Sequence, residues 1–309
     1  MTSEAIRTQW FSYHKADAPS KRLWPRVIKS HDEIPYGFHE ALSDTYAELP
    51  YLIFIPEEQN LLFQQKRNAQ MLCLHQDRLV ILEAVNDQAV STTYPFNAIR
   101  SVEHGKVLLN SWLTINTAET SKTISFNTVV ESVFAPIIKA LRLSGAQETS
   151  ADAVKDQQEV AKLGYLWKKN LKYFNYSKQS LLPGETILES VYQPELRRSA
   201  LTFFKKPVFR TSLPGHLSIL TDNEIIFIKE SEKTPVVNNS YGGIATYIPL
   251  KQVQRVTFEP QNHHDTDSMA IFQLVDGQEL RFHYSTKTAE NLAAFQEACA
   301  RKFNAAQVS

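Results

Sequence analysis

The sequence predicts an α+β protein made of two copies of one strand-rich unit, each of which ends in a helix. Apolar residues alternate up to Tyr284 and then recur three or four positions apart from Leu292 to Phe303, so a strand leads directly into a helix. The same change of period occurs in the first half of the chain, where Ile124 and Phe126 alternate just before Thr128, a natural helix N-cap. Polar turns at matching places in both halves complete the pattern.

The composition is that of ordinary globular protein, with 43% hydrophobic and 21% charged residues. A chain of 309 residues is long enough for two domains with separate cores. The formal net charge of +0 gives no bulk attraction to nucleic acid, so no nucleic-acid partner is expected. No apolar run has the length of a signal peptide or a membrane span, and the expected compartment is therefore the cytoplasm.

The cysteine content predicts thiols and no disulfide. Cys73 and Cys299 are the two cysteines, and each falls on an apolar strand or helix face in a different copy. Buried free cysteines behave as small hydrophobic residues, which suits both positions.

The first 49 residues are expected to form an N-terminal arm and a short helix. Residues 1–30 show weak periodicity, with aromatic residues scattered among charges. Residues 36–48 have helical spacing that stops before Pro50. This arm lies outside both copies.

The first copy is predicted at residues 50–143 as seven strands and a helix over 128–143. Its alternating, β-rich runs are Tyr51–Ile55, Met71–His75, Leu79–Leu82, Val90–Tyr94, Ile99–Val102, Trp112–Ile115 and Thr123–Phe126. Residues 144–183 follow as a polar, partly helical linker, which Pro183 and Gly184 end.

The second copy is predicted at residues 184–309, again as seven strands and a helix. Its runs are Thr186–Tyr192, Leu217–Leu220, Ile225–Lys229, Ile244–Ile248, Val253–Phe258, Met269–Val275 and Glu279–Tyr284. Asp276-Gly277 is a strong hairpin signal between the last two. The two copies agree in order, spacing and residue type, which is the mark of an internal repeat.

Two short motifs resemble the bacterial pleckstrin-homology-like families. The element Ile248-Pro249-Leu250-Lys251-Gln252-Val253-Gln254-Arg255-Val256 matches their strand-loop-strand motif, and Pro95-Phe-Asn-Ala-Ile-Arg-Ser-Val echoes it in the first copy. Leu220-Thr221-Asp222-Asn223-Glu224-Ile225 matches a second motif, with Glu224 where the families have Arg. The resemblance covers roughly residues 50–143 and 184–304. It implies tandem pleckstrin-homology-like barrels of seven antiparallel strands, each closed by a C-terminal helix and joined by a helical linker, and it carries no catalytic residues.

A basic and aromatic segment between the first two strands of the second copy is the candidate contact surface. It runs Leu196-Arg-Arg-Ser-Ala-Leu-Thr-Phe-Phe-Lys-Lys-Pro-Val-Phe-Arg210. In eukaryotic relatives of the same superfold this loop often holds the basic residues that grip phosphoinositide headgroups. The candidate binding residues here are Arg197, Arg198, Phe203, Phe204, Lys205, Lys206 and Arg210. The cations could pair with phosphates, and the aromatic pair could enter an acyl boundary or the groove of a partner.

Three lysines on the preceding helical stretch extend this candidate surface: Lys168, Lys169 and Lys172. From Tyr165 to Arg210 there are nine Lys or Arg and three acids, a local balance of +6. The alternative is structural: the aromatic residues pack beneath a long loop and the charges are simply solvated, as most surface charges are.

Neither a metal site nor a catalytic site is expected. His263-His264-Asp265-Thr266-Asp267 clusters possible ligands, but adjacent side chains on a strand point to opposite faces, and a polar hairpin loop explains the run better. The phosphate-binding and nucleophile motifs of common enzyme classes are absent from the sequence. The expected function is therefore non-enzymatic binding or scaffolding without a cofactor, with a protein partner or self-association. Peripheral binding to anionic membrane lipid and homo-oligomeric assembly are the alternatives.

Overall fold

The computed structural model describes residues 24–42, 51–60, 65–86, 88–143, 153–203, 206–230, 242–261 and 268–304. The chain separates into two compact units. Unit 1 comprises Met1–Ile99, Leu109–Ser111 and Ile124–Gly145, and unit 2 comprises Arg100–Leu108, Trp112–Thr123 and Ala146–Ser309.

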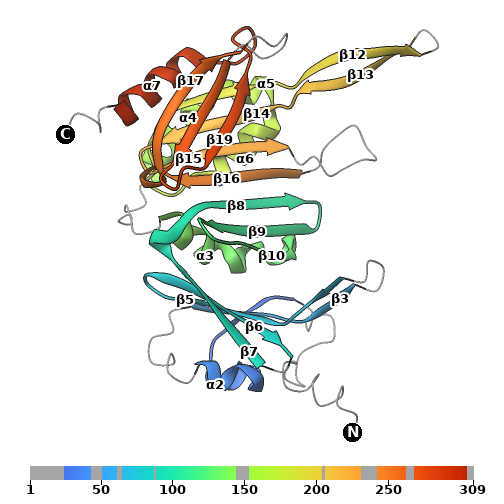
Figure 1. The fold of residues 1–309 in the computed structure, drawn as a ribbon, viewed down its shortest axis with the longest axis vertical. Coiled ribbons are helices and arrows are strands. Elements are labelled where there is room, and N and C mark those ends of the chain that lie inside the picture. Colours follow the sequence, from blue (N-terminus) through green and yellow to red (C-terminus); the bar gives the residue numbers. More distant parts are fainter. Residues whose placement is uncertain are drawn as a thin grey trace. The chain divides into compact units, whose positions relative to one another are not determined.

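Unit 1 is built on a five-stranded antiparallel sheet (Figure 1). In spatial order its strands are β1 (Arg26–Ile28), β2 (Tyr51–Ile55), β5 (Gln70–Leu74), β6 (Arg78–Val85) and β7 (Gln88–Pro95). A small hairpin, β3 (Glu58–Asn60) with β4 (Gln65–Arg67), lies between β2 and β5 in the chain. Asn86 permits the tight turn between β6 and β7, because its φ of 49° lies in the left-handed region that Asn tolerates.

The core of unit 1 comes from the alternation of its strands and from short helices. The 3-10 turns η2 (His31–Glu33) and η3 (Tyr36–Phe38) and the helix α2 (His39–Leu42) bring Phe38 and Leu42 onto the sheet, where both are buried. The helix α3 (Glu131–Leu143) follows η6 (Thr128–Val130), and its Phe134 stacks on Phe126 with ring centroids 3.8 Å apart. The Tyr51 hydroxyl donates to the carbonyl of Val133 at 2.8 Å.

A seven-stranded antiparallel sheet, most of whose residues belong to unit 2, carries the sites described below. In spatial order its strands are β10 (Ser121–Asn127), β9 (Asn110–Thr117), β8 (Ile99–Val107), β16 (Gly242–Pro249), β15 (Glu224–Glu230), β14 (His216–Thr221) and β11 (Ile187–Gln193). Two glycines let aromatic rings lie on the sheet. An added Cβ would come 2.0 Å from Trp112 at Gly105 and 2.7 Å from Tyr176 at Gly243.

One face of this sheet packs against a three-stranded sheet and a helix. These are β17 (Val253–Pro260), β18 (Ser268–Leu274), β19 (Glu279–Tyr284) and α7 (Leu292–Asn304), with the 3-10 turn η7 (Leu250–Gln252) leading into β17. Phe227 of β15 stacks on Phe282 of β19 with centroids 3.6 Å apart, and the hydroxyls of Ser218 and Tyr284 are hydrogen-bonded at 2.7 Å. Phe295 of α7 is fully buried in the same core.

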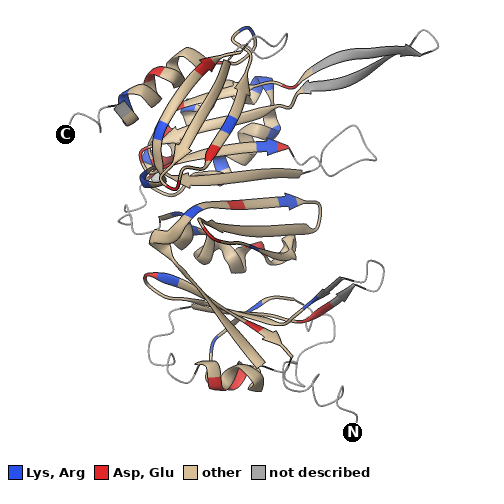
Figure 2. Ribbon diagram, in the orientation of Figure 1, with Lys and Arg blue, Asp and Glu red and all other residues tan. Residues whose placement is uncertain are grey.

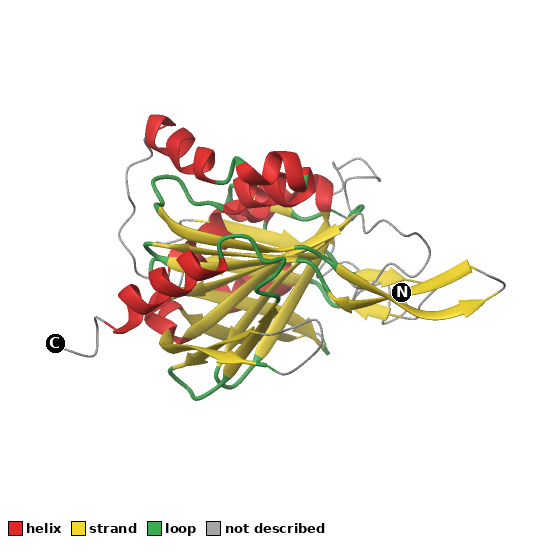
Figure 3. Cartoon of the chain, turned by 90° about the horizontal axis from the view of Figure 1, so that it is seen from above, coloured by secondary structure: helices red, strands yellow, loops and turns green. Residues whose placement is uncertain are grey.

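The helices α4 (Ala153–Lys162), α5 (Tyr165–Lys169) and α6 (Leu171–Ser180) precede this sheet in the chain, and α6 packs on β15 and β16. Between β11 and β14 the chain makes a long hairpin, β12 (Leu196–Phe203) with β13 (Lys206–Leu213). Two views show this hairpin extending away from the sheets of unit 2 (Figure 1; Figure 3). We call Leu196–Leu213 the arm.

The predicted pair of seven-stranded barrels is wrong. The larger sheets of the described residues are three and all open, and neither α3 nor α7 is a closing cap. The strands β8, β9 and β10 do not close on the first strands of their own copy. Instead β8 pairs with β16, with Lys106 opposite Gly243, and so extends the sheet of the second copy. Alternation in the sequence specifies which residues of a strand face inward, but not which strand edges join.

Candidate functional site

The segment predicted as a basic loop is a two-stranded ribbon. Five of its candidate residues lie on the strands of the arm: Arg197, Arg198, Phe203, Lys206 and Arg210. Phe204 and Lys205 lie outside the described residues. The register puts Arg198 directly opposite Arg210, and residues 196–213 contain five Lys or Arg and no acid.

The root of the arm is packed tightly against α6. The Tyr173 hydroxyl donates to the carbonyl of Gly215 at 2.5 Å, just after β13. An added Cβ at Gly215 would lie 3.1 Å from the backbone nitrogen of Glu195, just before β12. A side chain at Gly215 would therefore crowd the backbone where the two ends of the arm come together.

Two of the three predicted lysines already have acidic partners. Lys169 donates to Glu290, and Lys172 lies 3.3 Å from Glu230. Lys168 is exposed. Nearby, Trp167 is 59% exposed and meets Phe174 only through an edge-on ring contact at 5.3 Å. Of the three predicted lysines, Lys168 is thus the exposed one without an acidic partner among the described residues, and it lies next to the exposed Trp167 in the chain.

Charge elsewhere in the described residues is mixed. Figure 2 shows cationic and acidic residues interspersed along the helices and strands of both units. The arm carries charges of one sign, and so does the 18-residue helical stretch 162–179, which has five Lys and no acid but in which Lys162, Lys169 and Lys172 have acidic partners.

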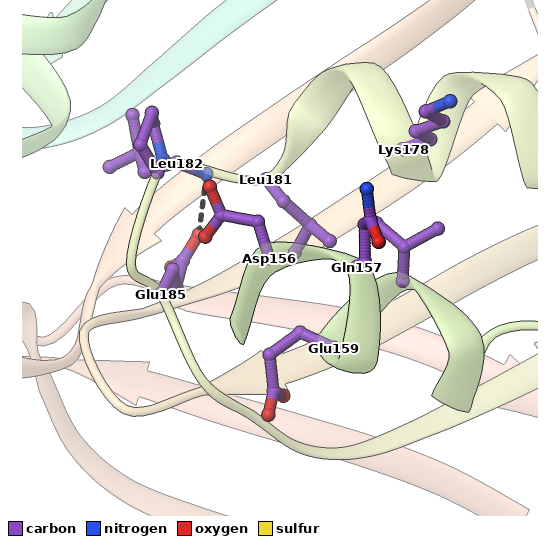
Figure 4. Close-up of a pocket in the computed structure, with 9 residues that line it drawn as sticks. Asp156, Gln157, Glu159, Lys178, Leu181, Leu182 and Glu185 are labelled. Carbon is purple, nitrogen blue, oxygen red and sulfur yellow. Dashed lines mark hydrogen bonds between the residues drawn. The ribbon is translucent and has the colours of Figure 1, made fainter. Parts of the chain in front are cut away.

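A groove beside α4 is the first of two hollows in unit 2, with a volume of about 290 Å³ (Figure 4). Three of its lining residues are carboxylates: Asp156, Glu159 and Glu185. Asp156 Oδ1 accepts from the backbone nitrogen of Gly184 at 2.7 Å, and Glu159 Oε2 accepts from that of Ile187 at 2.6 Å.

Glu185 is used in the same way. It is 1% exposed, and its Oε2 accepts from the backbone nitrogen of Leu182 at 2.9 Å. Its other oxygen accepts from the Thr221 hydroxyl at 2.6 Å. The carboxylates of the α4 groove hold the turn before β11 in place, which is a structural role.

The second hollow, the sheet pocket, has a volume of about 430 Å³, within the usual range for small-molecule sites. It lies on the face of the seven-stranded sheet that packs against β19, and all its lining residues belong to unit 2. The register places Glu103 of β8 opposite Thr246 of β16, and Thr246 opposite Phe227 of β15. These three are neighbours on one face.

The polar wall of the sheet pocket continues onto β9. Ser101, two residues before Glu103, is 8% exposed and accepts from Asn116 Nδ2 at 3.1 Å. Glu103 Oε1 accepts from Trp112 Nε1 at 2.9 Å. Polar side chains from β8, β9 and β16 therefore line this side of the pocket, and all of them except Ser101 are half-buried.

Two histidines complete this wall. His216 Nδ1 lies 3.3 Å from the carbonyl of Pro214, and burial lowers the pKa of the ring to about 4, so it is neutral near pH 7. His216 Nε2 and His283 Nδ1 are buried and have no hydrogen-bond partner among the described residues. Such groups call for an explanation, since buried polar atoms are almost always paired.

Sequence analysis missed the sheet pocket. Its residues come from seven strands, and the only local signal was a histidine at the start of the apolar run His216-Leu-Ser-Ile-Leu. The predicted polar loop at His263–Asp267 lies outside the described residues. Within the described ranges no group of three or more His, Cys, Asp or Glu could hold a metal ion, and no helix is long and apolar enough to cross a membrane.

No protein-family model matches this chain, and neither does any curated protein sequence. The resemblance to pleckstrin-homology-like families therefore stays a prediction. What can be said of function depends on the arm and the sheet pocket.

Proposed function

We propose that this chain is a non-enzymatic binding protein of the cytoplasm, and that the arm holds an acidic protein partner. The observation that carries the proposal is the arm itself, a ribbon outside the larger sheets that bears five cations and no acid.

Three properties of the arm favour a partner over a solvated loop. An isolated two-stranded hairpin is only marginally stable in water, so a contact along it adds to its stability. The register pairs Arg198 with Arg210, and like charges at paired positions of a ladder are unfavourable, so an acidic partner would suit this hairpin. The arm also pairs with no further strand in the described part of the chain, which leaves its edges open to an added strand.

Charge reversal on the arm tests this proposal. Replacing Arg197, Arg198, Lys206 and Arg210 by Glu should weaken binding of the full chain to an acidic polypeptide such as poly-glutamate by at least roughly tenfold, since several charged contacts are lost. The matched control makes the same charge change at exposed cations of unit 2: Arg255, Lys287, Arg301 and Lys302. Binding of the unaltered protein should fall as salt rises.

The same two variants separate the alternatives. Binding to phosphatidylserine vesicles with none to poly-glutamate would replace the protein partner by a membrane surface. Light scattering that shows self-association, lost only in the arm variant, would replace it by a second copy of this chain. Equal binding by both variants would contradict a role for the arm.

A further inference from the structure

Among the described residues, two charges of the sheet pocket, Glu103 and Lys229, have no ion-pair partner, and of these two only Glu103 is half-buried. Within the described residues the neutral indole of Trp112 donates to it, and no Lys, Arg or His forms an ion pair with it. Glu103 is half-buried, and removing a carboxylate from water is unfavourable unless a cation or several hydrogen bonds compensate.

The other charges at this pocket are accounted for elsewhere. Arg281 is paired with Glu279 at 2.7 Å, and Glu230 is paired with Lys172 at 3.3 Å. Lys229 is exposed and lies on β15, two strands away from Glu103 in the ladder. The half-buried charge of the pocket that has no ion-pair partner among the described residues is therefore negative.

We propose that the sheet pocket binds a primary ammonium group, with Glu103 as its counterion. An ammonium has three N–H donors, and Glu103, Ser101 and Thr246 offer acceptor oxygens from adjacent strands. The stacked rings of Phe227 and Phe282 give the attached carbon chain an apolar wall. The pocket reaches the last residue of the arm, Leu213, but the cationic residues of the arm do not line it, so this proposal does not depend on the arm's charges.

The histidines are a second, independent observation for a donor-bearing ligand. His216 Nε2 and His283 Nδ1 belong to residues that line the same pocket, and both lack a hydrogen-bond partner among the described residues. Since Nδ1 of His216 faces the Pro214 carbonyl and the ring is neutral, its Nε2 is an acceptor. The unpartnered acceptor at His216 Nε2 suits a ligand that carries N–H donors.

Two sources could present this ammonium: a free alkylamine, or a lysine side chain of another protein. Isothermal titration of the full chain with 1,4-diaminobutane and with N-acetyl-lysine-methylamide compares them. We expect binding of at least one of these amines and none of 1,4-butanediol, which keeps the length and loses the charge. Tighter binding of the diamine assigns the site to a free amine, and tighter binding of the lysine derivative assigns it to a protein side chain.

Glu103→Gln is the decisive variant, because the amide oxygen can still accept from Trp112 while the charge is gone. Amine affinity should fall roughly 10- to 100-fold, the usual value of a hydrogen bond to a charged group. Glu119→Gln, an exposed position in the turn after β9, makes the same charge change and should bind as the unaltered protein does.

A second measurement needs no variant at Glu103. In ¹⁵N-labelled protein the indole N–H signal of Trp112 should move on addition of amine, because its acceptor is the proposed counterion, while that of the distant, exposed Trp167 should not. Three results would overturn the proposal: no heat and no shift with either amine, equal binding of 1,4-butanediol, or unchanged affinity in Glu103→Gln.

Discussion

The α4 groove and the sheet pocket are both hollows with carboxylates in their walls, yet they use these groups in opposite ways. In the α4 groove, Asp156, Glu159 and Glu185 each accept a hydrogen bond from a backbone N–H of residues 182–187. In the sheet pocket, Glu103 accepts one bond from Trp112, and two histidine nitrogens nearby have no donor among the described residues.

This difference separates carboxylates that stabilise the fold from carboxylates that can bind a ligand. A backbone N–H that is buried without an acceptor costs free energy, so a carboxylate that supplies the acceptor belongs to the fold. A half-buried carboxylate with neither a cation nor a set of N–H donors lowers stability. It is expected where a ligand supplies what the chain does not.

The largest effect in this comparison is expected at Glu185. Glu185→Ala leaves the buried N–H of Leu182 without its side-chain acceptor and removes one of the two acceptors of the Thr221 hydroxyl, the other being the carbonyl of Glu224. The free energy of unfolding should fall by roughly 3–5 kcal/mol, as for other broken buried networks. Urea unfolding of the full chain measures it.

Glu185→Gln is the control, because its amide oxygen can still accept from Leu182. It should lose less than half as much as the alanine variant. If both substitutions leave the unfolding midpoint unchanged, the carboxylate is not holding the turn, and the contrast with Glu103 disappears.

The second-largest effect is expected from acid, which should lower the free energy of unfolding through His216 of the sheet pocket. Burial lowers the pKa of His216 from its ordinary value of 6.5 to about 4, so the unfolded chain binds a proton in this range that the folded chain does not. Stability from the neutral ring is fully present above pH 6.5 and is lost as pH falls toward 4. The whole loss is about 3 kcal/mol, and most carboxylates remain ionised down to pH 5.

Unfolding free energies at pH 7, 6 and 5 test this for the unaltered protein and for His216→Phe, which keeps an aromatic ring at the site. The slope between pH 6.5 and 5 should be shallower in the variant. Equal slopes would mean that His216 is not buried in its neutral form, and a proton titrating near pH 6.5 in its NMR signal would say the same.

The sequence predicted local structure correctly where the pattern within a single strand or helix is enough to determine it. Tyr51–Ile55 and Glu279–Tyr284 are strands at the predicted residues, and the predicted helix over 128–143 corresponds to η6 followed by α3. Both cysteines are buried and free, as predicted. Each of these features depends on alternation, spacing or a cap within a short window.

What failed depends on contacts between distant segments. The barrels were wrong because β8 joins β16, and edge pairing leaves no periodic signal in either strand. The segment predicted as a loop is a hairpin. Its strands were missed because two irregularities in register, between Leu196 and Arg197 and between Ser199 and Leu201, interrupt the alternation of its residues. The sheet pocket could not be foreseen, since Ser101, Thr246 and His283 meet only when the sheets pack.

The smallest effect on the free energy of unfolding is expected for Glu103→Gln. A small value here would show that Glu103 does not hold the fold together. Glu103→Gln keeps the acceptor for Trp112 and removes a charge that no cation of the described residues balances. The free energy of unfolding should therefore change by no more than about 0.5 kcal/mol, or rise slightly, because the desolvation cost of the charge is relieved. A loss of more than about 2 kcal/mol would show that Glu103 is a structural acid like Glu185. The two hollows would then differ in shape alone, and the sheet pocket would have no free charge to offer a ligand.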